Sequence, residues 1–152
     1  MKKLILCIIT ALFFSLGMSA QNVETKAAYK YEFIVNIDKT GKPIERKLDG
    51  SGIVLFAQAA GQEAISVTIG ETEMYTGIVY SKKQELPDKN TKMIVYLAIQ
   101  EFQGHKVPLQ IFEIYDLRKS SYIPDSFTVM ICSEKTGEMI QGQSFHNVSR
   151  IR

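Results

Sequence analysis

Residues 93–116 constrain the fold more than any other part of the sequence, because they carry the pattern of one long β-hairpin. β-branched and aromatic side chains dominate both arms, and such side chains suit a pleated sheet. A two-residue turn at Gln103-Gly104 would set Phe102 directly opposite His105. The sequence therefore predicts two antiparallel strands joined with no intervening loop.

In this register both faces of the hairpin are apolar. One face would carry Ile94, Tyr96, Ala98, Phe102, Val107, Leu109 and Ile111, and the other Met93, Val95, Leu97, Ile99, Phe112 and Ile114. A strand with one face in water normally carries polar side chains on that face, so we expect a second sheet, a loop or another subunit to cover this one. Pro108 cannot donate to a strand ladder, so we expect it where no neighbour needs its missing N–H.

The rest of the chain is also strand-like. Residues 29–37 alternate at period two, which predicts one strand with Tyr29, Tyr31, Phe33, Val35 and Ile37 on a single face. Turns with glycine at a positive-φ position are expected at residues 38–41 and 134–137. Residues 81–91 and 117–124 are polar and are interpreted as the two long connections. Further strands are predicted within residues 53–58, 64–69, 73–80, 127–132 and 138–145.

These segments predict an all-β domain of about eight mostly antiparallel strands, since neighbouring strands with short connections pair antiparallel. Two architectures fit this pattern. One is an up-and-down meander closed into a calycin-like barrel, and the other is a two-sheet β-sandwich. Sequential rather than crossing connections favour the barrel.

The first twenty residues are typical of a secretory signal peptide. Lys2-Lys3 precede an apolar run over residues 4–16, and small residues at 17–20 would supply a cleavage site before Gln21. We therefore expect residues 1–20 to be removed and residues 21–152 to form a single domain, exported to the periplasm or beyond the cell. No transmembrane span is expected after cleavage, because the apolar run is too short to cross a bilayer.

The charge pattern argues against nucleic-acid binding. The chain has 18 Lys and Arg against 16 Asp and Glu, so removal of Lys2 and Lys3 leaves equal numbers. A neutral chain without a basic stripe lacks the electrostatic footprint of a nucleic-acid protein. Only Cys132 would survive maturation, which excludes an internal disulfide, and we interpret it as a buried, unreactive side chain.

No motif for catalysis, metal binding or a cofactor stands out, and no cofactor is expected. Gly142-Gln143-Ser144-Phe145-His146 lacks the second glycine of a nucleophile elbow. His105 and His146 have no second ligand at a recognised metal spacing, and both are interpreted as surface histidines. The strand count and export resemble those of lipocalin-type barrels. That resemblance is one of architecture, since the chain has no tryptophan for their Gly-x-Trp motif.

Three functions remain open at this point. The first is a non-catalytic binding module for a small apolar ligand or a partner protein, and the second is a structural protein that forms homo-oligomers through the 93–116 hairpin. The third is an extracytoplasmic hydrolase that uses His105 or His146. Tyr96, Phe112 and Tyr115 are the predicted contacts with a ligand or partner, because aromatic side chains of the hairpin would supply contact area.

Overall fold

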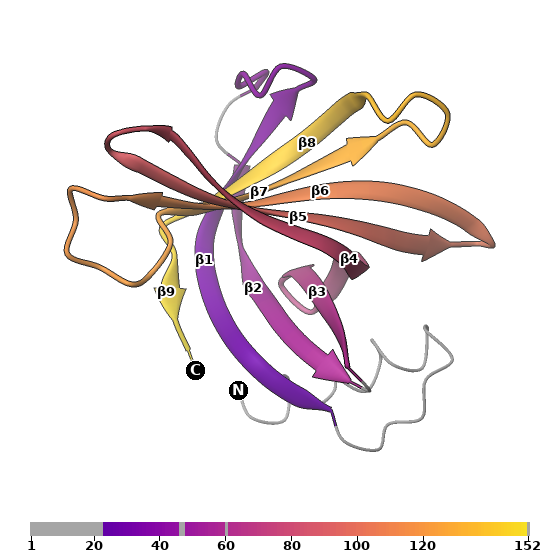
Figure 1. Cartoon of the computed structure of the whole chain (residues 1–152), viewed down its shortest axis with the longest axis horizontal. Coiled ribbons are helices and arrows are strands. Elements are labelled where there is room, and N and C mark those ends of the chain that lie inside the picture. The colour runs from indigo at the N-terminus through magenta and orange to yellow at the C-terminus, as the bar shows by residue number, and fades with distance from the viewer. Residues whose placement is uncertain (1–22, 46–47, 60, 152) are drawn as a thin grey trace.

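The structure is a computed structural model that describes residues 23–45, 48–59 and 61–151, so the predicted signal peptide lies outside the described residues. The described chain is all-β (Figure 1). Its strands are β1 (Glu24–Asp38), β2 (Leu48–Ala59), β3 (Gln62–Ile69), β4 (Thr72–Asp88), β5 (Thr91–Phe102), β6 (His105–Asp116), β7 (Ser126–Cys132), β8 (Met139–His146) and β9 (Ser149–Arg150).

Eight of these strands close into an up-and-down antiparallel barrel of calycin-like architecture. Strands β2 to β8 pair in sequence order, and β1 closes the ring because it pairs with both β8 and β2. Two residues of β9 add to β1 through Tyr29 and Lys30. The prediction of a meander barrel is therefore confirmed, and the two-sheet sandwich is excluded.

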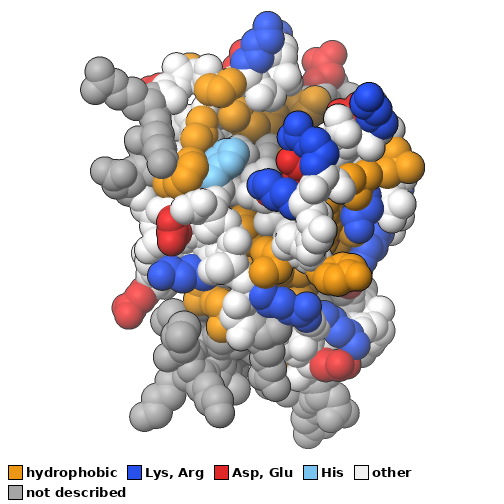
Figure 2. Space-filling view, turned by 90° about the vertical axis from the view of Figure 1, so that its left-hand side faces the viewer, with side chains coloured by type: hydrophobic (Ala, Val, Ile, Leu, Met, Phe, Trp, Pro, Cys, Tyr) orange, Lys and Arg blue, Asp and Glu red, His pale blue; other side chains and the backbone are white. Residues whose placement is uncertain are grey.

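One end of the barrel gathers β9, the β4–β5 turn and the connection between β6 and β7, and we call it the β9 end. It lies on the left in Figure 1 and faces the viewer in Figure 2. Lys and Arg side chains cluster there beside hydrophobic side chains and a histidine. This end is therefore charged at its rim, although the chain as a whole is close to neutral.

The central hairpin forms in the predicted register. Phe102 lies opposite His105 and the pairing continues to Thr91 opposite Asp116. Gln103 and Gly104 both have positive φ, at 50° and 78°, as a two-residue turn between twisted strands requires. Pro108 lies in the part of β6 that pairs with β5 alone, since the ladder to β7 begins at Leu109. The predicted turn glycines Gly41 and Gly137 also have positive φ.

The interpretation of residues 81–91 as a long polar connection is wrong. β4 continues to Asp88 and pairs with β5 down to Thr91, and an irregularity between Glu85 and Asp88 accommodates Pro87. The segment is polar because it is largely exposed, with Leu86 63% exposed. Because its side chains are exposed, this part of β4 pairs with β5 without presenting an apolar face. The sequence there therefore lacks the alternation of apolar and polar residues that marks a half-buried strand.

The expectation that residues 29–37 present one face is also wrong. The β1 ladder is irregular between Tyr31 and Phe33. Tyr29 and Tyr31 belong to the core cluster inside the barrel, and so does Ile34. Phe33 instead pairs and stacks with His146 on the outer face, at a ring-centroid distance of 5.1 Å. The second half of β1 therefore turns its odd-numbered side chains outwards.

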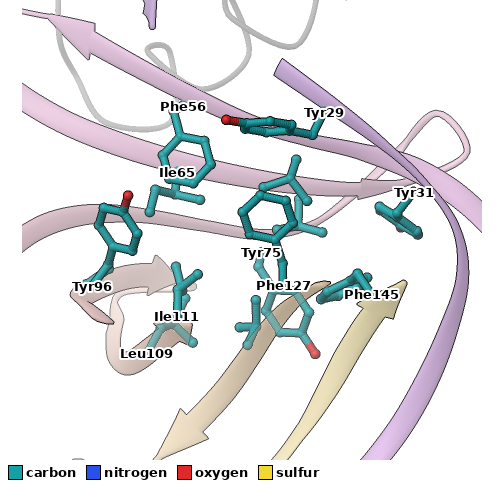
Figure 3. Packing of buried hydrophobic residues seen from close by; sticks show 14 of the residues in the cluster. Tyr29, Tyr31, Phe56, Ile65, Tyr75, Tyr96, Leu109, Ile111, Phe127 and Phe145 are labelled. Atoms are coloured by element: carbon teal, nitrogen blue, oxygen red, sulfur yellow. The ribbon is translucent and has the colours of Figure 1, made fainter. Parts of the chain in front are cut away.

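Aromatic rings fill the barrel interior (Figure 3). Phe127 lies 5.2 Å from Tyr29 and 5.8 Å from Phe56 between ring centroids, and Phe56 lies 5.4 Å from Tyr96. Phe145 continues the cluster towards the other end, 4.8 Å from Tyr31. Such contacts, together with the apolar area that each ring buries, make this cluster the main source of stability.

Gly52 makes room for one of these rings. Tyr31 pairs with Gly52 across the β1–β2 ladder, and its hydroxyl donates to the Thr68 backbone carbonyl at 2.5 Å. A Cβ at position 52 would lie 1.8 Å from that carbonyl oxygen and 2.4 Å from the Tyr31 hydroxyl. Because a Cβ never comes that close to backbone, the glycine is required by the close approach of three strands.

We predict that Gly52→Ala lowers the free energy of unfolding by about 1–3 kcal/mol, the usual cost of overpacking. Urea denaturation followed by circular dichroism measures it. Gly50→Ala is the matched control, since its Cβ would meet only the Ile34 and Ile69 side chains, at ordinary distances of 3.5 and 3.9 Å. Equal losses in the two variants would contradict the close packing at Gly52.

Candidate functional site

A groove of about 660 Å³ lies on the outer face of the barrel. Its walls come from β6 on one side and the second half of β1 on the other, and its floor comes from β7 and β8. The described residues that line it are Phe33, Val35, Ile37, Thr40, Gly41, Pro43, Phe112, Ile114, Ser126, Thr128, Met130, Met139, Ser144 and His146. No Lys, Arg, Asp or Glu stands among them.

The groove follows from the sizes of side chains in register across four strands. In one row Phe112 pairs with Thr128, Thr128 with Ser144, and Ser144 with Val35. Large apolar side chains therefore stand on β6 and β1, and small hydroxyl side chains stand between them. Because neighbouring strands lie about 4.8 Å apart, two strands of small residues leave a trough between the flanking strands.

Gly142 shapes the floor at the end away from β9. It pairs with Met130 on β7 and Ile37 on β1. A Cβ on this glycine would lie 2.4 Å from the Met130 sulfur, so the Met130 side chain occupies the space above β8. The floor at this end is accordingly apolar, and Met139 extends it.

The turn after β1 bounds the same end of the groove. Asp38 accepts hydrogen bonds from the Thr40 hydroxyl at 2.7 Å and the Lys42 backbone N–H at 3.0 Å. These bonds hold the pKa of Asp38 below its usual value. Pro43 then forms a bridge back to Ile37. The turn therefore holds Thr40, Gly41 and Pro43 at the rim.

The end of the groove near β9 is more polar. Ser126 and His146 are directly paired across β7 and β8, and the His146 ring stacks on Phe33 with an interplanar angle of 13°. In the middle of the floor the hydroxyls of Thr128 and Ser144 share a hydrogen bond of 3.0 Å. The imidazole thus lies at one end of the trough beside Ser126, the hydroxyls in the middle are bonded to each other, and Met130 and Met139 line the other end.

A second group of functional side chains lies inside the barrel at the β9 end. Glu113 is only 4% exposed, and its two carboxylate oxygens accept hydrogen bonds from the Tyr96 hydroxyl at 2.7 Å and the Tyr115 hydroxyl at 2.6 Å. Charge-assisted bonds of this kind compensate for the burial of a carboxylate. Glu113 therefore ties β5 to β6 within the core.

Each of the two tyrosines also carries a lysine over its ring. Lys82 Nζ lies 4.9 Å from the Tyr96 ring centroid, and Lys92 Nζ lies 4.2 Å from the Tyr115 centroid. Burial raises the pKa of both hydroxyls, and the Glu113 carboxylate raises it further. Each tyrosine therefore has a lysine ammonium over its ring and the buried Glu113 carboxylate at its hydroxyl. Together these side chains close the β9 end of the core.

The three side chains predicted as ligand or partner contacts do not lie together. Tyr96 and Tyr115 meet at Glu113 inside the barrel, whereas Phe112 stands on the opposite face of β6 and forms a wall of the groove. Glu113 was not predicted from the sequence. Its signal was a lone carboxylate on the face of the hairpin that carries Ile111.

The floor of the groove was also not predicted from the sequence. Ser126 and Thr128 alternate with Phe127 and Val129, so a period-two reading of β7 would have found small side chains on its outer face. His146 was interpreted as a surface histidine, but it is partly buried in the groove. His105 is exposed in its turn, as expected.

The remaining candidates carry no site. Cys132 is buried and unpaired, and burial raises the pKa of its thiol. Within the described residues no cluster of His, Cys, Asp and Glu could hold a metal ion. The described part of the chain likewise contains no helix long and apolar enough to cross a membrane.

Comparison with protein-family models, with curated proteins and with solved structures finds no match to this chain.

We predict that Tyr96→Phe lowers the free energy of unfolding by about 1–3 kcal/mol, because the buried Glu113 loses one of its two donors. Tyr80→Phe is the matched control and is expected to change stability by less than about 0.5 kcal/mol, since Tyr80 is 62% exposed. Chemical denaturation of the two variants and the parent compares them. A neutral Tyr96→Phe would show that the bond to Glu113 contributes little.

The same cluster predicts a loss of stability in alkali. The unfolded tyrosines release their protons near the ordinary pKa of 10.0, whereas the folded pKa values of Tyr96 and Tyr115 are higher. Stability is therefore complete below about pH 10 and falls as the pH rises above it. Urea titrations between about pH 8 and about pH 11 measure the slope. The slope should be shallower in the Tyr96→Phe, Tyr115→Phe double variant, and an unchanged slope would assign the effect to other groups.

Proposed function

We propose that this chain is an exported, non-catalytic binding module that takes a small apolar ligand in its outer groove. The observation that carries the proposal is the hollow itself: apolar walls on β6 and β1 around a floor of small side chains. A volume of about 660 Å³ falls in the range of small-molecule sites, which are mostly apolar with a few placed polar groups. Phe112, one of the predicted contacts, belongs to this groove.

The groove supports binding better than the middle of the barrel does. The rings of Tyr29, Phe56 and Phe127 contact one another across the interior, so a ligand there would have to displace packed aromatic side chains. Disrupting a close-packed core costs several kcal/mol. A ligand in the groove displaces only water from a surface that is already formed.

Two other functions would also use the outer face of the barrel. Assembly with a partner or a second copy would use the outer face of the hairpin, where Leu97 and Ile99 are partly exposed. A hydrolase would need a base and an orienting group beside a nucleophile. His146 and Ser126 share the groove, but among the described residues no hydrogen bond joins the Ser126 hydroxyl to the imidazole. The geometry therefore favours binding.

We predict that Thr128→Leu weakens the binding of the neutral fluorescent probe N-phenyl-1-naphthylamine at least about tenfold, because a branched side chain in the middle of the floor fills the trough. Fluorescence titration of the mature chain measures the affinity. Ser81→Leu, on an exposed position of β4, is the matched control and should bind like the parent. Equal probe binding by all three proteins would contradict a site in the groove.

A further inference from the structure

The groove changes in polarity along its length, and this gradient indicates the class of its ligand. We propose that it binds a single-chain amphiphile with a carboxylate head, a free fatty acid of about ten carbons, with the head at Ser126 and His146 and the tail towards Met130 and Met139. This inference rests on the proposed function and specifies its ligand.

The apolar part of the trough has the length of such a tail. The floor runs along β7 from Ser126 to Met130, which at about 3.3 Å per residue is about 13 Å, close to the length of ten extended carbons. Val35 and Ile37 line this stretch on one side and Phe112 on the other. Because both walls are apolar throughout, the stretch suits a methylene chain, which has no hydrogen bonds to satisfy.

The polar end offers a donor that is not yet used. The Ser126 hydroxyl takes part in no hydrogen bond between described residues, although Ser126 is only 8% exposed. Every fully buried polar side-chain atom of the described residues has a partner, so this oxygen is open to the groove. His146 is its direct cross-strand neighbour, and paired side chains on a sheet lie about 5 Å apart. A carboxylate at that position can accept a hydrogen bond from the Ser126 hydroxyl while it faces the His146 imidazole.

The surroundings of this end favour an anionic head. It opens towards the β9 end, where Lys and Arg side chains gather beside a histidine (Figure 2). The two carboxylates on the adjoining connection are already paired, Asp116 with Arg118 at 2.7 Å and Asp125 with Lys119. These pairs offset the charges of both acids and of Arg118 and Lys119, and no Asp or Glu is among the described residues that line the groove, so the carboxylate head meets no unpaired acid there.

The experiment compares decanoate with decanol, which has the same tail and a neutral head, by isothermal titration calorimetry on the mature chain at neutral pH. The parent is expected to bind decanoate at least about tenfold more tightly than decanol, since charge-assisted hydrogen bonds are the stronger ones. Ser126→Ala and His146→Phe should each reduce this preference at least about threefold. His146→Phe retains a ring to stack on Phe33. Ser120→Ala, in the exposed connection before β7, is the control and should keep the parental preference.

The outcomes separate this inference from the proposed function. Binding of the neutral probe with no preference for decanoate, or a preference unchanged in both head-group variants, would overturn the carboxylate assignment and leave the groove as an apolar site. Decanoate binding that survives Thr128→Leu would place the fatty acid elsewhere and also overturn it. Failure of the parent to bind the probe, decanol or decanoate would overturn the proposed function itself.

Discussion

The irregularity in β1 between Tyr31 and Phe33 is the constraint on which the rest of the molecule depends. The first half of β1 sends Tyr29 and Tyr31 into the barrel and pairs with β2. Just after the irregularity, Phe33 and Ile34 pair with both β2 and β8, and the rest of β1 continues along β8 with Val35 turned outwards. Pairing of β1 with both β2 and β8 closes the ring of the described strands. The change of face supplies one wall of the groove. The same strand therefore takes part in both closure and the groove, and its irregularity lets the side chains change face between the two.

Closure with aromatic side chains has a consequence for where a ligand can bind. Eight strands enclose a space that side chains can fill, and here Phe56, Phe127 and Phe145 fill it. Capacity for a ligand then has to come from the outside of the sheet. The groove arises over β7 and β8, because the small side chains of Thr128 and Ser144 lie between large side chains on β6 and β1. Along β7 and β8, alternate side chains thus fill the interior on one face of the sheet and form the floor of the groove on the other.

A feature of the fold or the groove could be predicted from the sequence where it depends on residues that are close together along the chain. A turn fixes the register of its own two strands. The turn at Gln103-Gly104 and the glycine turns at residues 38–41 and 134–137 therefore predict their hairpins. The face reversal in β1 was not predictable in that way, since it depends on pairing with β8, a partner more than 100 residues away. The groove was missed for the same reason: Thr128, Ser144 and Val35 become one row only once three separate strands are aligned. Glu113 was locally visible as a charge on an apolar face, and both of its tyrosine donors are neighbours on that face, Tyr115 two residues along β6 and Tyr96 diagonally across the hairpin.

The floor of the groove also bears on stability. At the centre of a sheet face between apolar walls, β-branched and larger apolar side chains would bury more area, at about 25 cal/mol per Å², than Ser126, Thr128, Ser144 and Gly142 do. The chain instead places small side chains at adjacent positions on two neighbouring strands, and it compensates one pair of hydroxyls with a mutual hydrogen bond. A surface that forgoes this stabilisation is characteristic of sites where function competes with stability. Under the proposed function, the competing demand is space for the ligand.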